Sequence, residues 1–251
     1  MENLINQLTK NFPITSQTST NDKLFLLQTM NLIKSKVGRF SYLEIGSFLG
    51  GSLTPFLLEP LCEDVLSVDD RERQQPDERG IKYDYAGITH ITMIQNLSKH
   101  GVPIEKLTTH DGSIDTIPNK LNKYDLIFID GEHTDVACFR DFIWSYKSAK
   151  EDSIILFHDS DLTYKGLTII KEYLRSLGVK NQMKKINSSV VTGIYLGEFS
   201  QIEFESIYGA QQEWDDFYEK SEIKVLKDII TNRMSINFTT NILPIKNQKA
   251  Y

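Results

Sequence analysis

The sequence predicts an α/β fold, a Rossmann-like, doubly wound and mostly parallel sheet with helices on both faces. Three observations predict it. Short apolar runs alternate with helix-length stretches along residues 39–198. The runs YDLIFID (124–130) and SIILFH (153–158) are apolar at successive positions, which is typical of strands buried on both faces. A glycine-rich turn, within YLEIGSFLGGS (42–52), follows the first predicted strand.

The expected elements begin with a helix over 21–37, whose apolar residues recur at near-helical spacing. These residues are Leu24, Leu27, Met30, Ile33 and Val37. We expect this helix to cover one face of the sheet and to lead into the first strand. With the polar opening before it, it forms an N-terminal helical cap, residues 1–38.

The central domain, 39–198, is expected to contain six strands, each marked by a short apolar run. They are placed at 40–46, 64–69, 107–111, 124–130, 153–158 and 190–196. Helices are expected between most of them, at 51–59, 88–100, 134–150 and 167–177. Gly178 follows the last of these helices and is typical of the residue just beyond a helix end.

Two segments depart from this alternation. Residues 70–87 are rich in charge and turn formers and poor in aliphatic residues, so we expect a loop near the crevice that is a candidate lid. Beyond Gly197 the strand pattern stops, and 202–220 with 221–234 indicate one or two helices before a polar tail. This C-terminal helical extension, 199–251, is expected either to cover the substrate or to pair with another subunit as a homodimer.

Composition limits the possible partners and compartment. The 251-residue chain is 40% hydrophobic and 25% charged, as in ordinary globular proteins, and it can bury one substantial core. Its net charge of -6 argues against nucleic acid as a partner, because phosphate binding needs clustered Lys and Arg. Its two cysteines are too few for a disulfide framework. With neither a signal-peptide pattern nor an apolar stretch near the roughly 20 residues of a membrane span, we expect a cytoplasmic protein.

The first glycine-rich turn is a candidate nucleoside site. Gly46, Gly50 and Gly51 are expected to keep side chains away from a ligand that lies across the strand end. Ser47 and Phe48 follow Gly46, so the middle glycine that admits a dinucleotide pyrophosphate is missing, which favours S-adenosylmethionine. The alternative is a tight turn without a ligand. The candidate cofactor-binding residues of this region are Glu44, Gly46, Ser47, Gly50 and Ser52.

The second and third strand ends supply further candidate cofactor ligands. Asp69 ends the second strand, where its carboxylate can accept both ribose hydroxyls, and Asp70 is expected to face the surface. Asp111, after the third strand, is a candidate acceptor for the adenine amine, with Ser113 beside it. Taken alone, the Asp-Gly-Ser triplet is more typical of a simple turn.

The fourth and fifth strand ends carry the most specific group of side chains: Asp130, Glu132, His133, His158 and Asp159. Adjacent parallel strands bring such ends into one small volume. Carboxylates suit Mg²⁺ or Mn²⁺, and a histidine ligand shifts the preference toward Mn²⁺ or a later transition metal. The alternative is that the aspartates cap the following helices and the histidines are simply solvated.

Taken in order, these motifs resemble a known family. Over about 40–197 the chain resembles a class I S-adenosylmethionine-dependent methyltransferase. The resemblance lies in E-x-G-x-x-x-G, the acid after the second strand, Asp-Gly after the third, FIDGEH and FHDS. FIDGEH and FHDS are similar to those of metal-assisted small-molecule and sugar O-methyltransferases that act on macrolide and aminocoumarin antibiotics. The resemblance implies that Asp130, also a candidate cofactor ligand, binds a divalent ion together with positions 158 and 159. It implies either Glu132 or His133 as the base. The chain departs from the family at His158, where a carboxylate is usual.

The function expected from the sequence is transfer of a methyl group from S-adenosylmethionine to a small-molecule or sugar hydroxyl, with Mg²⁺ or Mn²⁺ held by Asp130, His158 and Asp159. His133 is the expected base and Glu132 the reserve. Two alternatives stay open, a non-catalytic protein that binds S-adenosylmethionine or S-adenosylhomocysteine, and a nicotinamide-dependent oxidoreductase. The many ionisable groups at the fourth and fifth strand ends argue against a pure binder.

Overall fold

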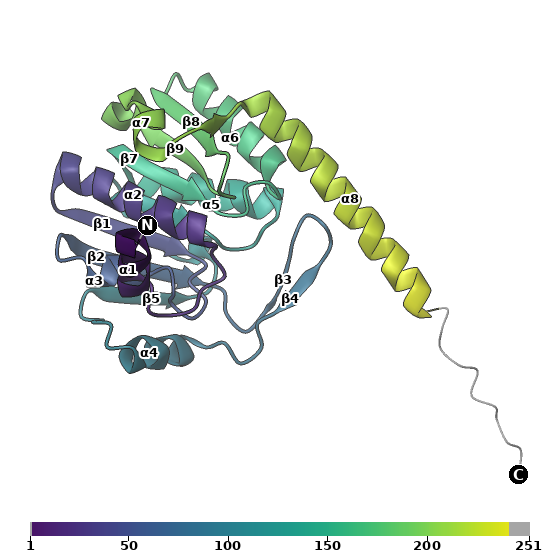
Figure 1. The fold of residues 1–251 in the computed structure, drawn as a ribbon, viewed down its shortest axis with the longest axis horizontal. Helices are drawn as coiled ribbons and strands as arrows, with labels where there is room; N and C mark the ends of the chain where they lie inside the picture. Colours follow the sequence, from purple (N-terminus) through teal and green to yellow (C-terminus); the bar gives the residue numbers. More distant parts are fainter. Residues whose placement is uncertain (1, 241–251) are drawn as a thin grey trace, which may run out of the picture.

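The computed structural model describes residues 2–240, with side chains from 6 to 233, around one large central sheet (Figure 1). Its strands are β1 (Phe40–Ile45), β2 (Cys62–Asp69), β5 (Leu107–Asp111), β6 (Tyr124–Ile129), β7 (Ala149–Phe157), β8 (Asn181–Ile186), β9 (Thr192–Leu196) and β10 (Gln211–Gln212). They lie in the order β10-β8-β9-β7-β6-β1-β2-β5. The five strands from β5 to β7 are mutually parallel, and β9, β8 and β10 are antiparallel additions.

The parallel arrangement brings the carboxyl ends of the strands to one edge. Ile45 of β1 pairs with Ile129 of β6, and Ile129 pairs with Phe157 of β7. The residues that follow these three strands therefore start side by side. The chain order reverses at β1, whose neighbours are β2 and β6, and ligands of open α/β sheets bind at such a switch point.

Helices cover both faces of this sheet, which confirms the doubly wound prediction. They are α1 (Glu2–Asn11), α2 (Thr20–Val37), α3 (Thr54–Leu58), α4 (His90–Lys99), α5 (Asp135–Ser148), α6 (Tyr164–Ser176), α7 (Phe204–Tyr208) and α8 (Trp214–Thr240), with 3-10 turns at Ile114–Thr116 and Gly197–Gln201. One apolar cluster joins α2, α3, α4 and α7 to one face, and a second joins α5, α6 and the start of α8 to the other. Tyr42 and Leu43 are adjacent in β1 but belong to different clusters, as strand alternation requires.

The expected strands and helices are found, with differences at the margins. The helix expected at 51–59 is only the short α3, because 51–53 still belong to the turn that follows β1. The strand β8 was not predicted: its sequence NQMKKI is mostly polar, and it is only half-buried beside the sheet edge. α1 falls in the segment taken as a polar opening. Gly178 does follow the end of α6, with φ at 65°.

The segment 70–87 is more ordered than a loop. It contains a hairpin of two short antiparallel strands, β3 (Gln74–Pro76) and β4 (Lys82–Asp84). Glu78, at its tip, donates its backbone N–H to the carbonyl of His133 at 3.1 Å and accepts the N–H of Asp135 at 2.6 Å. The hairpin therefore lies against the loop between β6 and α5, and its role as a lid stays a prediction.

α8 accounts for much of the C-terminal extension and leaves the body as a long arm (Figure 1). Arg79 of the hairpin forms an ion pair with Asp228 of α8 at 3.2 Å. On either side of Asp228, Ile223, Leu226 and Ile230 of α8 are exposed. The polar tail expected at the end lies in 241–251, outside the described residues. Between residues 2 and 240, no helix is both long enough and apolar enough to cross a bilayer.

Candidate active site

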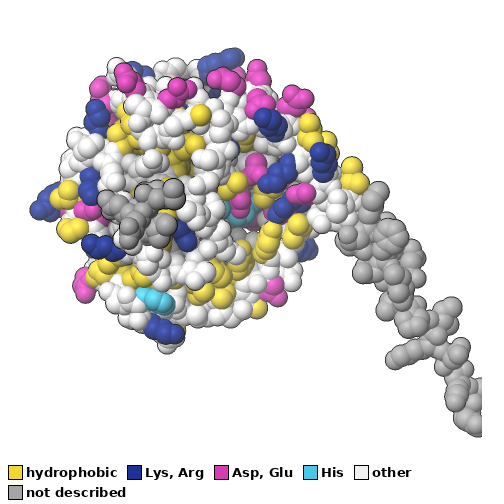
Figure 2. All heavy atoms as spheres, viewed as in Figure 1, with side chains coloured by type: hydrophobic (Ala, Val, Ile, Leu, Met, Phe, Trp, Pro, Cys, Tyr) yellow, Lys and Arg dark blue, Asp and Glu magenta, His cyan; other side chains and the backbone are white. Residues whose placement is uncertain are grey.

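Two adjoining cavities open at the carboxyl ends of the parallel strands. The first has about 580 Å³ of empty space, part of it open to solvent, and is lined by residues 16–18, 46–48, 51 and 52 with Tyr85, Asp130 and His133, among others. Gly50, a predicted cofactor-binding residue, does not line it and packs against Met93 and Leu97 of α4. The second cavity has about 620 Å³ of empty space, and its lining includes Ser113, Glu132 and Arg140. They share Gly46, Asp69, Gln75 and Gly131. Figure 2 shows acidic side chains and a histidine gathered in a hollow between the body and α8.

The turn after β1 is held by the end of β2. The backbone N–H groups of Ser47 and Phe48 donate to Oδ2 of Asp69 at 2.9 and 2.7 Å. Gly46 has φ at 86°, and a Cβ there would lie 2.0 Å from the carbonyl oxygen of Asp130. A Cβ on Gly51 would lie 2.6 Å from the side chain of Ser16. The contacts that demand these two glycines are thus with neighbouring segments of the chain, whereas we had expected them to clear space for a ligand.

Glu44 lies behind this turn and lines neither cavity. It is fully buried, and its carboxylate accepts hydrogen bonds from Tyr42 Oη at 2.6 Å and Ser52 Oγ at 2.8 Å. Burial raises the pKa of Glu44 to about 8, and the negative charge of Asp130 adds to the rise. Ser52 does line the first cavity. Glu44 therefore reaches the site through its hydrogen bond with Ser52.

The protonation of Glu44 makes a pH-dependent stability testable. Between about pH 4.5 and 8 the folded chain holds a proton that the unfolded chain has lost, so Glu44 lowers stability as the pH rises. The variant Glu44→Gln cannot ionise at this position. We expect its free energy of unfolding, relative to that of wild type, to rise by about 1–3 kcal/mol from pH 5 to pH 8. Urea unfolding at both pH values measures this. The exposed Glu205→Gln serves as the control, and an equal difference at both pH values for Glu44→Gln would contradict the burial argument.

Of the other predicted cofactor ligands, Asp69 and Ser113 line a cavity and Asp111 does not. Asp69 lines both cavities; burial raises its pKa, although Arg71 and the turn N–H groups oppose the rise. Ser113 lines the second cavity. Asp111 lines neither, since its half-exposed carboxylate pairs with Arg71 Nη1 at 2.5 Å. Arg71 itself is buried and lines the first cavity, and our sequence reasoning passed over it because a lone arginine in a charged stretch carries no motif.

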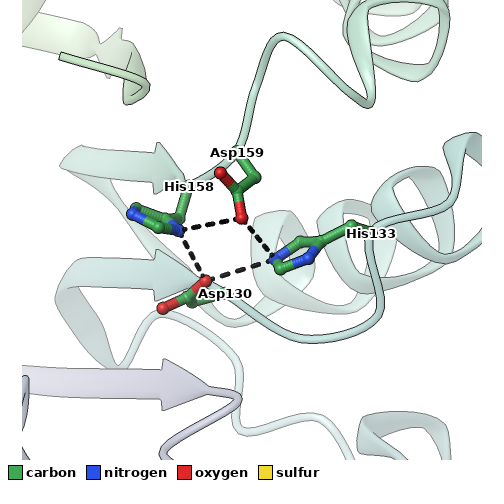
Figure 3. A group of neighbouring side chains, drawn as sticks. All are labelled: Asp130, His133, His158 and Asp159. Carbon is green, nitrogen blue, oxygen red and sulfur yellow. Dashed lines mark hydrogen bonds and ion pairs between the residues drawn. The ribbon is translucent and has the colours of Figure 1, made fainter. Parts of the chain in front are cut away.

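Four side chains meet beyond β6 and β7 (Figure 3). Oδ1 of Asp130 lies 2.9 Å from Nδ1 of His158 and 3.3 Å from Nε2 of His133. Oδ2 of Asp159 lies 3.5 Å from each of these nitrogens. Asp159 takes φ of 45°, an uncommon backbone conformation that aims its carboxylate into the group. We call Asp130, His133, His158 and Asp159 the acid–histidine cluster.

The cluster has the donors and spacing of a divalent-metal site. One atom from each residue lies within 4.8 Å of all the others. Two ligands that are each about 2.1 Å from one ion, at angles of 90–110°, are about 3.0–3.4 Å apart, close to the distances seen here. The buried Nδ1 of His158 has no hydrogen-bond partner among the described residues. The predicted metal set is thus brought together, and His133 joins it.

Opposite charges balance inside the cluster. Burial alone would lower the pKa of His158, but the carboxylates of Asp130, Asp159 and Asp22 hold it well above its ordinary value. The pKa of His133 is raised in the same way against the effect of burial. Burial would raise the pKa of Asp159, but the two histidines lower it to about 2. A divalent ion that binds here has to displace protons from the histidines.

The two candidate bases occupy different places. His133 lines the first cavity and points into the cluster. Glu132 lies outside the cluster, where it lines the second cavity near Arg140 and accepts a hydrogen bond from Thr134 Oγ1 at 2.7 Å. Glu132 and His133 are adjacent in the chain but line different cavities.

Asp22 is a residue of the site that sequence reasoning missed. This buried carboxylate of α2 lies 3.4 Å from Nε2 of His158. In the sequence, Ser19 three residues before Asp22 indicates only the start of a helix. In the structure these two residues form the capping box of α2, in which each side chain accepts the backbone N–H of the other. Nothing in the sequence links it to His158, which is 136 residues away.

The fold and the cleft define a class of protein. A doubly wound sheet, with a glycine turn after β1 and an acid at the end of β2 that share one cleft, has the architecture of a class I methyltransferase. Residues 43–160 match a family model described as a methyltransferase domain. Residues 43–160 therefore carry a methyltransferase domain, as the motifs predicted.

Other proteins resemble the chain in sequence or in fold. Over 171 residues the chain is 26% identical to the uncharacterized protein R132 of Acanthamoeba polyphaga mimivirus, a match that spans 66% of each chain, just under two thirds of that relative's length. The structure of the O-methyltransferase NovP is 11% identical and covers 72% of this chain and 82% of its own, with a TM-score of 0.54. The O-methyltransferase TomG from Streptomyces achromogenes, solved in complex with SAM, is 15% identical and covers 78% and 90%, with a TM-score of 0.50. At these identities the two structures show a shared fold.

Proposed function

We propose that this methyltransferase acts on a hydroxyl group of a small molecule, with a divalent metal ion at the acid–histidine cluster. The observation that carries the proposal is the position of the cluster: Asp130 and His133 belong to it and also line the first cavity. An acceptor in this cavity would have a metal site and a base beside it. NovP and TomG are O-methyltransferases, which supports the choice of oxygen as the acceptor atom.

The cofactor is expected to span both cavities. Oδ2 of Asp69 is taken by the turn, which leaves its Oδ1 to accept a ribose hydroxyl. Ser113 would then lie on the adenine side, and Ser47 and Ser52 on the methionine side. The sulfonium would sit near Asp130, whose negative charge stabilises a cation.

The chemistry asks little more than alignment and one proton transfer. The acceptor oxygen attacks the methyl carbon in line with the sulfur, the C–S bond breaks, and its electron pair stays on sulfur as S-adenosylhomocysteine leaves. The acceptor proton passes to Nε2 of His133, with Glu132 as the reserve base. An ion held by Asp130, His158 and Asp159 would lower the pKa of the acceptor hydroxyl. With His158 as a ligand, Mn²⁺ or a later transition metal is favoured over Mg²⁺.

His133→Ala tests the base. We expect kcat to fall about 10²–10⁴-fold, the usual contribution of a general base, while the Kd for S-adenosylmethionine stays within about threefold of wild type because the predicted cofactor contacts lie elsewhere. Steady-state kinetics and calorimetric titration measure the two quantities, and Glu132→Gln is the matched comparison. A parallel loss of turnover and cofactor affinity in His133→Ala would assign His133 a structural role. A loss confined to metal affinity would make it a ligand.

The acceptor class and the metal can be tested together. Incubation with a methyl-labelled donor and a panel of sugars, phenols and aliphatic alcohols should label one class at oxygen, and chelation should stop the labelling. Turnover that survives exhaustive chelation would remove the ion from the proposal. A sugar hydroxyl remains the acceptor we expect, and the cytoplasmic location and the homodimer also stay predictions.

A further inference from the structure

Helix α2 places one carboxylate, that of Asp22, beside the acid–histidine cluster. Oδ2 of Asp22 lies 3.4 Å from Nε2 of His158. Both side chains are buried, Asp22 to 1% and His158 to 5% exposure. A region expected only to cover the sheet therefore contacts a candidate metal ligand directly.

Asp22 is itself rigidly held. Oδ2 accepts the backbone N–H of Ser19 at 2.9 Å and its hydroxyl at 2.6 Å. Oδ1 accepts the hydroxyl of Ser189 at 2.5 Å and the N–H of Val190 at 3.2 Å. Burial would raise the pKa of Asp22, but the hydrogen bonds from His158, Ser189 and Ser19 hold it well below its ordinary value. The carboxylate is thus a fixed, charged acceptor.

The two nitrogens of His158 have different surroundings. Nε2 faces Asp22, whereas Nδ1 faces Asp130 at 2.9 Å and Asp159 at 3.5 Å without a hydrogen bond among the described residues. In a neutral imidazole, the nitrogen that donates a hydrogen bond keeps its proton, and the other presents a lone pair. Donation from Nε2 to Asp22 therefore turns the lone pair of Nδ1 toward the cluster.

We propose that Asp22 is a positioning residue of the metal site: it accepts the Nε2–H of His158 and so presents Nδ1 as a metal ligand. This inference rests on the proposed function, because it requires the cluster to take a divalent ion. Metal-bound histidines commonly donate their other N–H to such an outer carboxylate, whose loss typically costs 10- to 100-fold in metal affinity. α2 then belongs to the active site.

Metal binding by the full chain, without cofactor or acceptor, tests the role. We expect Asp22→Asn to weaken Mn²⁺ binding 10- to 100-fold, measured by the paramagnetic resonance signal of free Mn²⁺. The asparagine keeps the shape of the side chain and removes the negative charge that faces Nε2 of His158. The control, Asp215→Asn, makes the same change at an exposed acid of α8, and its affinity should stay within threefold of wild type.

A double-mutant cycle separates positioning from mere stability. His158→Asp replaces the imidazole with a carboxylate, so position 158 no longer offers Asp22 an N–H. The two carboxylates repel each other instead. In that background Asp22→Asn should leave Mn²⁺ affinity unchanged or improve it. Equal weakening in both backgrounds, or affinity within threefold of wild type in Asp22→Asn alone, would overturn the inference while leaving the proposed function intact. A wild-type chain that binds no Mn²⁺ would overturn both the inference and the metal in that function.

The wild-type chain offers a test that does not depend on how the variants fold. With ¹⁵N-labelled histidine and Zn²⁺ as a diamagnetic probe, nuclear magnetic resonance distinguishes the protonated ring nitrogen from the metal-bound one. We expect His158 to carry its proton on Nε2 and the metal on Nδ1. The reverse assignment would overturn the inference.

Discussion

Asp130→Asn should nearly abolish methyl transfer, lowering kcat/KM by about 10³-fold or more, a loss of about 4 kcal/mol in transition-state stabilisation. Oδ1 of Asp130 is the oxygen that contacts both His158, at 2.9 Å, and His133, at 3.3 Å. The residue also lines the first cavity, where the sulfonium is expected. In the proposed function its charge would serve the metal, the base and the cofactor at once, and an amide of the same shape would supply none of it.

A methyl-transfer assay with labelled donor measures the loss, with melting temperatures to show that the variant is folded. Asp215→Asn, an exposed acid at the start of α8, makes the same chemical change away from the cleft and should retain wild-type activity. If Asp130→Asn kept more than a tenth of wild-type kcat/KM, the cluster would not be the catalytic centre.

Gly46→Ala should destabilise the fold by about 3 kcal/mol and eliminate binding of S-adenosylmethionine. The new Cβ would lie 2.0 Å from the carbonyl oxygen of Asp130 and 2.7 Å from the nitrogen of Gly131, so the ends of β1 and β6 would have to separate. Overpacking typically costs about 1–3 kcal/mol, and positive φ adds about 1–2 kcal/mol for a residue with a Cβ. The separation would also displace Asp130 from the cluster.

Gly178→Ala isolates the backbone contribution. Gly178 also has a positive φ, 65°, but no atom lies within 4 Å of its added Cβ. Urea unfolding should therefore show about 1 kcal/mol of loss for Gly178→Ala, and calorimetry should show intact cofactor binding. Equal destabilisation by the two substitutions, with cofactor bound by both, would mean that close packing of the strand ends does not shape the site.

The sequence predicted the parts of the fold that burial controls. Strands β6 and β7 are buried on both faces over their last residues, so their apolar runs were visible without any structure. Parallel topology then made the meeting of Asp130, His133, His158 and Asp159 predictable, since residues that follow neighbouring parallel strands share one edge. The structure brings these four together; their roles as ligands and base stay predictions.

Features set by long-range contacts were not predictable. Strand β8 is polar and forms because β9 offers a free edge, which no local pattern reports. Asp111 is drawn to Arg71, away from the adenine role expected of it, because a buried guanidinium needs a carboxylate. Asp22 reads as a helix-capping residue, and only the packing of α2 over the strand ends shows its contact with His158.

Calorimetric titration of the full chain with S-adenosylmethionine tests most directly whether the strand ends form one cofactor site. We predict one molecule bound per chain, weaker binding in Asp69→Asn because its carboxylate holds the turn at Ser47 and Phe48, and no binding of NAD. Saturable binding of NAD, or no binding of S-adenosylmethionine by the wild-type chain, would contradict the function assigned to this cleft.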